Sequence, residues 1–178
     1  REQDLTKLVR DAVVLQQNGQ PGVSISATLP DHPVAMDVDA TMLSQALTNL
    51  IKNAGEAIET LVETGAPEGY RPEIRVSLED TAEGAVICIA DNAAGLPGGL
   101  GRLFEPYVTT RDKGTGLGLP IVKKIVEEHG GTLALLDAQP FSEGAHRGAL
   151  AEIRLPRLVR TDSVRSTLVK TKERAANG

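Results

Sequence analysis

The chain has little of several residue types on which other classes of protein depend. It has one cysteine, Cys88, in 178 residues, which excludes an internal disulfide framework and a four-cysteine zinc site. Its three histidines are scattered without metal-ligand spacing. Its apolar runs are only a few residues long, too short to cross a bilayer. The net charge of -5 argues against nucleic acid as the main partner. We therefore expect neither nucleic acid nor direct membrane contact.

The composition is that of a folded domain with a charged extension. Hydrophobic residues make up 40% of the chain and charged residues 24%, which is enough apolar material for a core. Residues 157–178 hold six Lys or Arg and two Asp or Glu, a balance of +4, so residues 1–156 carry -9. We predict one domain over residues 1–156, followed by a basic C-terminal tail, weakly structured or helical, over residues 157–178.

Hydrophobic periodicity predicts three helices, over residues 4–17, 40–63 and 117–129. Asp39 is a good N-cap for the second. Strands are expected over 23–29, 34–38, 73–79, 85–90, 132–136 and 148–155. The run 34–38 is interpreted as the hairpin partner of 23–29. The run 85–90 is continuously apolar, which predicts burial on both faces, with Cys88 as a small core residue. The order of elements favours an α+β two-layer sandwich, with the helices on one face of a mixed sheet.

Three polar residues share one stripe of the 40–63 helix. Asn49 and Asn53 are four residues apart, and Glu56 follows three later. Amide and carboxylate oxygens there could hold Mg²⁺, and Lys52 beside them could meet phosphate. The alternative is a solvated helix face with no ligand.

Asp91 follows directly after the apolar run 85–90. A carboxylate in that place can accept a hydrogen bond from the exocyclic amine of a nucleotide base. Gly95 would let a flat ring approach the backbone closely. The alternative is an Asx-type turn at the end of a strand.

Residues 92–116 have no periodicity, and such long connections are usually functional. They end in Gly114-Thr-Gly-Leu-Gly-Leu119, which leads into the third helix. Glycines and a helix N-terminus favour a phosphate ligand. The segment is neither a Walker A loop, since no Gly-Lys pair is present, nor a Rossmann fingerprint, since no strand precedes it.

Four segments in this order resemble the ordered boxes of sensor histidine kinases. Asn49-Leu-Ile-Lys-Asn53-Ala-Gly-Glu56-Ala resembles the N box, Asp91-Asn-Ala-Ala-Gly95-Leu-Pro97 the first glycine box, Leu103-Phe104-Glu105-Pro106-Tyr107 the F box, and Gly114 to Leu119 the second glycine box. The resemblance covers nearly all of residues 4–156 and is nearest to nitrogen-regulation sensor kinases. It implies the Bergerat ATP-binding fold of the GHKL superfamily, with about five strands, three helices on one face and a long ATP lid.

The resemblance also implies roles for individual residues. Asn53 would hold Mg²⁺ at the phosphates of ATP, with Asn49 supporting that site. Asp91 would read the adenine amine, and Gly95 would line the base pocket. Residues 96–113 would form the ATP lid, in which Arg111 and Lys113 are candidates for phosphate contact. The further nucleotide-binding candidates are Lys52, Leu96, Tyr107, Gly114, Thr115, Gly116, Leu117, Gly118 and Leu119.

Two other functions remain open within this resemblance. In the hydrolytic branch, a Glu stands four residues before the Mg²⁺-binding Asn and acts as general base. Here that residue is Asn49, which cannot take a proton, although Glu56, one turn beyond Asn53, could substitute. A degenerate nucleotide-sensing or partner-docking module is the other alternative. Its support is Ala93, where the first glycine box usually has Gly. If the backbone there requires positive φ, Ala would be strained by roughly 1 kcal/mol and nucleotide affinity would be weaker.

In the kinase interpretation, the phosphate acceptor lies outside this chain. None of His32, His129 and His146 begins the His-Glu/Asp motif of the family. The chain begins with Arg1, so we expect a longer protein with an upstream dimerisation domain that carries the acceptor histidine. A response regulator is the further partner implied. The fragment is expected to be a monomeric cytoplasmic domain, in a parent that could be anchored in the inner membrane.

Overall fold

A computed structural model of the chain describes residues 2–95, 118–142 and 148–157. These residues form three helices and seven strands. In chain order they are β1 (Glu2–Asp4), α1 (Leu5–Gly19), β2 (Ser24–Thr28), β3 (Ala35–Asp37), α2 (Ala40–Gly65), β4 (Glu73–Thr81), β5 (Gly84–Asp91), α3 (Gly118–Glu128), β6 (Thr132–Asp137) and β7 (Ala149–Pro156). The three predicted helices are confirmed to within a few residues at each end. The predicted tail lies outside the described residues from 158 onward.

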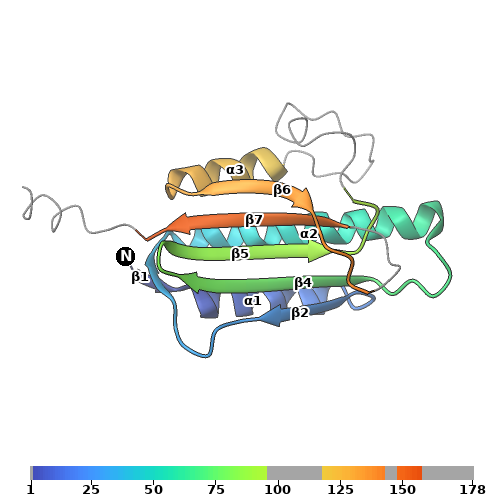
Figure 1. The fold of residues 1–178 in the computed structure, drawn as a ribbon, viewed down its shortest axis with the longest axis horizontal. Helices are drawn as coiled ribbons and strands as arrows, with labels where there is room; N and C mark the ends of the chain where they lie inside the picture. The colour runs from blue at the N-terminus through green and yellow to red at the C-terminus, as the bar shows by residue number, and fades with distance from the viewer. Residues whose placement is uncertain (1, 96–117, 143–147, 158–178) are drawn as a thin grey trace, which may run out of the picture.

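The main sheet has five strands in the order β2-β4-β5-β7-β6, and the three helices lie on one of its faces (Figure 1). The β2–β4 pair is parallel and the other three pairs are antiparallel. The predicted two-layer sandwich with a mixed sheet is therefore confirmed.

The predicted hairpin between residues 23–29 and 34–38 is wrong. β3 pairs instead with β1, in a separate antiparallel ladder, and β2 pairs with β4. The three residues of β1 are polar, so no apolar alternation marked them as a strand. The chain after β2 places Val34 and Met36 in the core, and the carbonyl of Val34 accepts a hydrogen bond from the amide of Leu5. These contacts draw the segment toward the N-terminus of α1 rather than back along β2.

Helix α2 is the central element of the helical layer. The carboxylate of Asp39 accepts a hydrogen bond from the amide of Met42 at 2.9 Å, which confirms Asp39 as the N-cap. Its apolar stripe is fully buried at Leu43, Leu47 and Ile51, and α2 packs against α1, α3, β4 and β5. Burial of each such side chain contributes about 1.5–3 kcal/mol. Within the described ranges, no helix combines the length and hydropathy needed to cross a membrane.

The expected burial of the 85–90 run on both faces is wrong at Cys88 and Ala90, which are both partly exposed. Ile87 and Ile89 are buried against the helices, whereas Cys88 points to the opposite face and is partly exposed. The helices cover only one face of the sheet, so alternate residues of β5 meet a face without a helical layer. Partial burial, followed by the charge of Glu152, raises the pKa of the Cys88 thiol. The residue is therefore a half-buried thiol of the outer sheet face.

An exposed charge network joins three distant segments of the chain. The imidazole of His32 bonds the carboxylates of Asp80 at 3.1 Å and Asp31 at 3.2 Å, and the guanidinium of Arg157 bonds Asp80. The bond to Asp80, followed by that to Asp31, raises the pKa of His32 above its usual 6.5. The bond from His32 holds the pKa of Asp80 below its usual 3.8, with Arg157 adding to the effect.

These two pKa shifts predict that the ionic bond between His32 and Asp80 stabilises the fold most at mildly acidic pH. The His32 contribution is fully present below pH 6.5 and is lost as pH rises through its raised folded-state pKa. The Asp80 contribution is present above pH 3.8 and is lost as pH falls through its lowered pKa. His32→Gln should therefore lower the free energy of unfolding most near pH 5 and least at alkaline pH, as measured by urea denaturation. A cost independent of pH, or one that survives 1 M salt unchanged, would contradict the ionic origin.

Candidate functional site

Asp91 ends β5 on the helical side of the sheet. It continues the alternation of Ile87 and Ile89, and it is only 5% exposed. One carboxylate oxygen, Oδ1, accepts hydrogen bonds from the amides of Ala93 at 2.9 Å and Ala149 at 3.2 Å. Two backbone N–H donors stabilise an ionised carboxylate and fix the orientation of its plane. A buried, oriented acceptor at the end of a strand is suited to reading a donor on a ligand.

The residue after Asp91 ties the α2–β4 loop to the end of β5. The side-chain carbonyl of Asn92 accepts bonds from the Tyr70 hydroxyl at 3.1 Å and the Glu73 amide at 3.0 Å. Its amide group donates to the carbonyl of Arg71 at 2.7 Å. Burial, followed by the charge of Asp91, raises the pKa of Tyr70 to about 12. Tyr70 is therefore a neutral hydroxyl donor at all ordinary pH values.

The backbone after Asp91 requires glycine at position 95 of the first glycine box but not at position 93. Gly95 has φ +92°, a conformation that favours glycine. Ala93 has no positive φ and is fully buried within the core, where its amide bonds Asp91. The strain considered for Ala93 is therefore not present, because a turn closed by the Asp91 carboxylate needs no left-handed residue there. The support that Ala93 offered for a degenerate module is removed.

The predicted polar stripe lies on α2 as expected from its spacing. Asn49, Asn53 and Glu56 are each partly buried, and Lys52 is exposed. Helix α2 packs against both β5 and α3, and it extends past the end of the sheet at which β5 finishes (Figure 1). The described residues contain no group of three or more His, Cys, Asp or Glu suited to a metal ion. The side-chain oxygens of this stripe are nevertheless of the kind that Mg²⁺ binds. This ion commonly takes only one or two protein oxygens and completes its shell with water and substrate phosphates.

Helix α3 begins at the same end of the molecule as the arrowhead of β5 (Figure 1). Two residues of the predicted second glycine box are described. Gly118 is buried at the start of α3, and Leu119 is partly buried and packs against the core. The lid over 96–113 lies outside the described residues, as do Leu96, Tyr107, Arg111, Lys113, Gly114, Thr115, Gly116 and Leu117.

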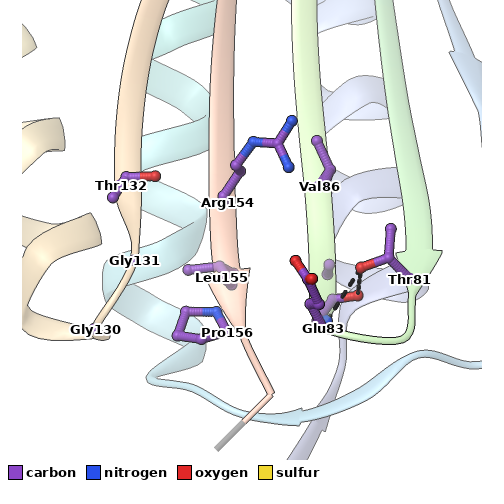
Figure 2. A pocket seen from close by; sticks show the side chains of 11 residues that line it. Thr81, Glu83, Val86, Gly130, Gly131, Thr132, Arg154, Leu155 and Pro156 are labelled. Atoms are coloured by element: carbon purple, nitrogen blue, oxygen red, sulfur yellow. Dashed lines mark hydrogen bonds between the residues drawn. The ribbon is translucent and has the colours of Figure 1, made fainter.

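A separate cavity of about 190 Å³ lies at the opposite end of β5, between the β4–β5 turn and the start of β6 (Figure 2). Glu83 and Arg154 line it, and the Arg154 guanidinium is already paired with Glu152 at 2.7 Å. It contains none of the predicted site residues. The candidate site therefore remains at the Asp91 end of β5.

Three residues of the site were not predicted from the sequence: Tyr70, Asn92 and Gly148. Tyr70 is one of only four aromatic residues and sits in the loop after α2, which was the one available signal. Gly148 touches Asp91 across 57 positions of chain, and no local pattern marks it. Their place in the site follows from the pairing of β4, β5 and β7.

Comparison with known sequences identifies related proteins. Residues 38–159 match the family described as histidine kinase-, DNA gyrase B-, and HSP90-like ATPase. The nitrogen regulation protein NtrY of Azorhizobium caulinodans is 48% identical over 144 residues, covering 80% of this chain and 18% of the relative. The sensory histidine kinase/phosphatase NtrB of Rhizobium leguminosarum bv. phaseoli is 38% identical over 110 residues, covering 56% of this chain and 28% of the relative. The chain thus matches less than a third of the length of either relative.

Solved structures of sensor histidine kinases share the fold of this chain. A mycobacterial sensor histidine kinase, MprB, superposes with a TM-score of 0.69 at 25% identity, covering 88% of this chain and 96% of that one. The ATP-binding domain of PrrB from Mycobacterium tuberculosis superposes with a TM-score of 0.64 at 26% identity, with the same coverage.

Proposed function

Because the chain belongs to the family of histidine kinase-, DNA gyrase B- and HSP90-like ATPases, we propose that it binds ATP with Mg²⁺ and donates the γ-phosphoryl group to a histidine of a sensor kinase. The observation that carries the proposal is Asp91. The residue is 5% exposed, and two backbone amides hold its Oδ1 in place. Such an acceptor fits the exocyclic amine of adenine.

Asn53 is the proposed Mg²⁺ ligand, with Asn49 supporting it one turn earlier on α2. An amide oxygen is a hard donor, in keeping with the preference of this ion. When bound, Mg²⁺ would neutralise charge on the phosphates of ATP. Lys52 and the first turn of α3 at Gly118 would add positive potential for the same phosphates. The remaining proposed contacts, from Leu96 to Leu117, rest on the sequence motifs alone.

Transfer to a protein side chain is favoured over hydrolysis by the residue at position 49. A hydrolase needs a general base to orient the attacking water, and a neutral amide cannot accept a proton. Glu56 is partly buried on the same stripe, so slow hydrolysis is the second candidate activity. Phosphoryl transfer itself depends mainly on positioning and charge stabilisation, which this set of residues can supply.

The acceptor histidine is proposed to lie on an upstream dimerisation domain, with a response regulator as the next partner. Both ring nitrogens of His129 are engaged, by the carbonyl of Ile125 at 2.7 Å and the amide of Asp39 at 2.9 Å. His32 is held between two carboxylates. Neither ring is placed as a free nucleophile, and His146 lies outside the described residues.

Calorimetric titration with a non-hydrolysable ATP analogue tests the proposal. Wild type should bind the analogue more tightly with Mg²⁺ than with EDTA. Asn53→Ala should lose most of that difference, about tenfold in affinity, while keeping the metal-independent part. Lys124→Ala, an exposed change on α3, is the matched control. Equal binding with and without Mg²⁺ in wild type would contradict the proposed metal role.

Incubation with γ-labelled ATP separates the two candidate activities. The isolated chain should acquire no acid-labile label, but it should label an added helical domain that carries the acceptor histidine. Acid-labile label on the chain itself would contradict an external acceptor. Rapid phosphate release without any acceptor would favour hydrolysis.

A further inference from the structure

The start of β7 closes directly on Asp91. Gly148 is buried, and a Cβ atom placed on it would lie 1.8 Å from the backbone carbonyl oxygen of Asp91 and 2.8 Å from its Oδ1. The next residue, Ala149, donates the amide bond to that same Oδ1 at 3.2 Å. The missing side chain at position 148 is therefore what allows the amide of Ala149 to reach the carboxylate.

A side chain at position 148 cannot be accommodated by a small adjustment. The nearest atoms are backbone atoms of Asp91, which ladder bonds to β4 hold in place. The β5–β7 ladder is paired from Ala90 and Leu150 onward, so the rest of the sheet can persist. The local outcome is a retreat of residues 148–149, which moves the Ala149 amide away from Oδ1 and releases the orientation of the carboxylate.

Tyr70 acts on the other side of the same strand end. Its hydroxyl donates to Asn92 at 3.1 Å, and Asn92 also bonds the backbone of Arg71 and Glu73. These bonds fix the residue that follows Asp91 to the loop before β4. The path of the backbone through Ala93, whose amide is the second donor to Oδ1, is set from that side.

We propose that Gly148 and Tyr70 are positioning residues that aim the Asp91 carboxylate, and that they thereby set the preference for a base bearing a 6-amino group. This rests on the proposed function, in which Asp91 reads adenine. Neither residue needs to touch the nucleotide. Their effect is on the contact that distinguishes adenine from a purine without the amine, and not on the contacts to ribose and phosphate.

The test compares ADP with purine riboside 5′-diphosphate, which lacks the amine, in the presence of Mg²⁺. Wild type should prefer ADP by about tenfold or more, because a charged acceptor left unpaired is costly. In Gly148→Ala the preference should fall to within about threefold, mainly through weaker ADP binding. Gly22→Ala is the matched control, because a Cβ there meets no atom within 4 Å, and its preference should equal that of wild type.

Tyr70→Phe keeps the ring and removes the bond to Asn92. It therefore tests the positioning role even if Gly148→Ala does not fold. It should lower the preference for ADP by about threefold, with a thermal unfolding transition still present. Equal losses for both nucleotides in Gly148→Ala, or an unchanged preference in Tyr70→Phe, would overturn the positioning role while leaving the proposed function intact. A wild type that binds both nucleotides equally would mean that Asp91 does not read the amine, which overturns the positioning role and the assignment of Asp91, whereas a wild type that binds neither would overturn the proposed function.

Discussion

Asp91→Asn should weaken ATP binding by roughly 100-fold while the domain stays folded. The two amides that bond Oδ1 admit only an acceptor at that atom. The new side chain must therefore place its carbonyl oxygen there and turn its NH₂ group toward the base. A donor then faces the donor of the adenine amine. The charge-assisted bond is lost and replaced by a repulsive contact, about 2–3 kcal/mol in total.

Titration calorimetry with ATP measures the change, and thermal unfolding reports the fold. Asp37→Asn is a suitable control, since it makes the same chemical change on an exposed carboxylate of β3. Its affinity for ATP should match that of wild type. Retention of ATP affinity within about threefold in Asp91→Asn, with the fold intact, would contradict the assignment of Asp91 to the base.

Gly84→Ala should lower the free energy of unfolding by about 3 kcal/mol, a large part of the total for a domain of this size. Gly84 opens β5 with φ +155°, and a Cβ there would lie 1.9 Å from the carbonyl oxygen of Leu155. That oxygen belongs to β7, where Gly84 is paired with the following residue, Pro156. Neither strand can move away from the new Cβ without breaking hydrogen bonds of the β5–β7 ladder. The melting temperature should fall by roughly 10 °C.

Denaturant unfolding of Gly84→Ala, with Gly22→Ala as control, checks this expectation. Gly84 is separated from Asp91 by the length of β5, roughly 23 Å at the rise of an extended strand. The folded fraction should therefore bind ATP with unchanged affinity. A loss below about 1 kcal/mol would mean that β5 and β7 separate at this end at little cost.

Asp91→Asn is expected to lower ATP affinity and Gly84→Ala to lower stability, because the two residues lie at opposite ends of β5. At its start β5 is closed by backbone pairing with β7, and at its end it presents a carboxylate to the helical layer. A central strand buried against helices holds its last residue rigidly. The predicted ligand contact therefore lies on a rigid element, which suits a residue that must discriminate one base from another.

The sequence by itself determined the helices and the class of fold, and it supplied the residues that we propose for the site. The apolar periodicity of residues 40–63 and the N-cap at Asp39 are local properties, and the structure confirms both. The spacing of Asn49, Asn53 and Glu56 places them on one stripe of any helix. Asp91 was marked by its place after an apolar run. Each of these inferences needed only the type of a residue, its place next to an apolar run, or the period of a helix or a strand.

Tertiary structure decided which strands pair and what holds Asp91 in position. The pairing of β3 with β1 could not be foreseen, because the polar residues of β1 carry no strand signal. Cys88 is half-buried because the helices cover one face of the sheet only. Ala93 is unstrained because the Asp91 carboxylate closes its turn. Gly148 reaches Asp91, and Tyr70 reaches the next residue, Asn92, from distant segments of the chain. Contacts between residues far apart in the chain depend on sheet order, and no local period of the sequence encodes that order.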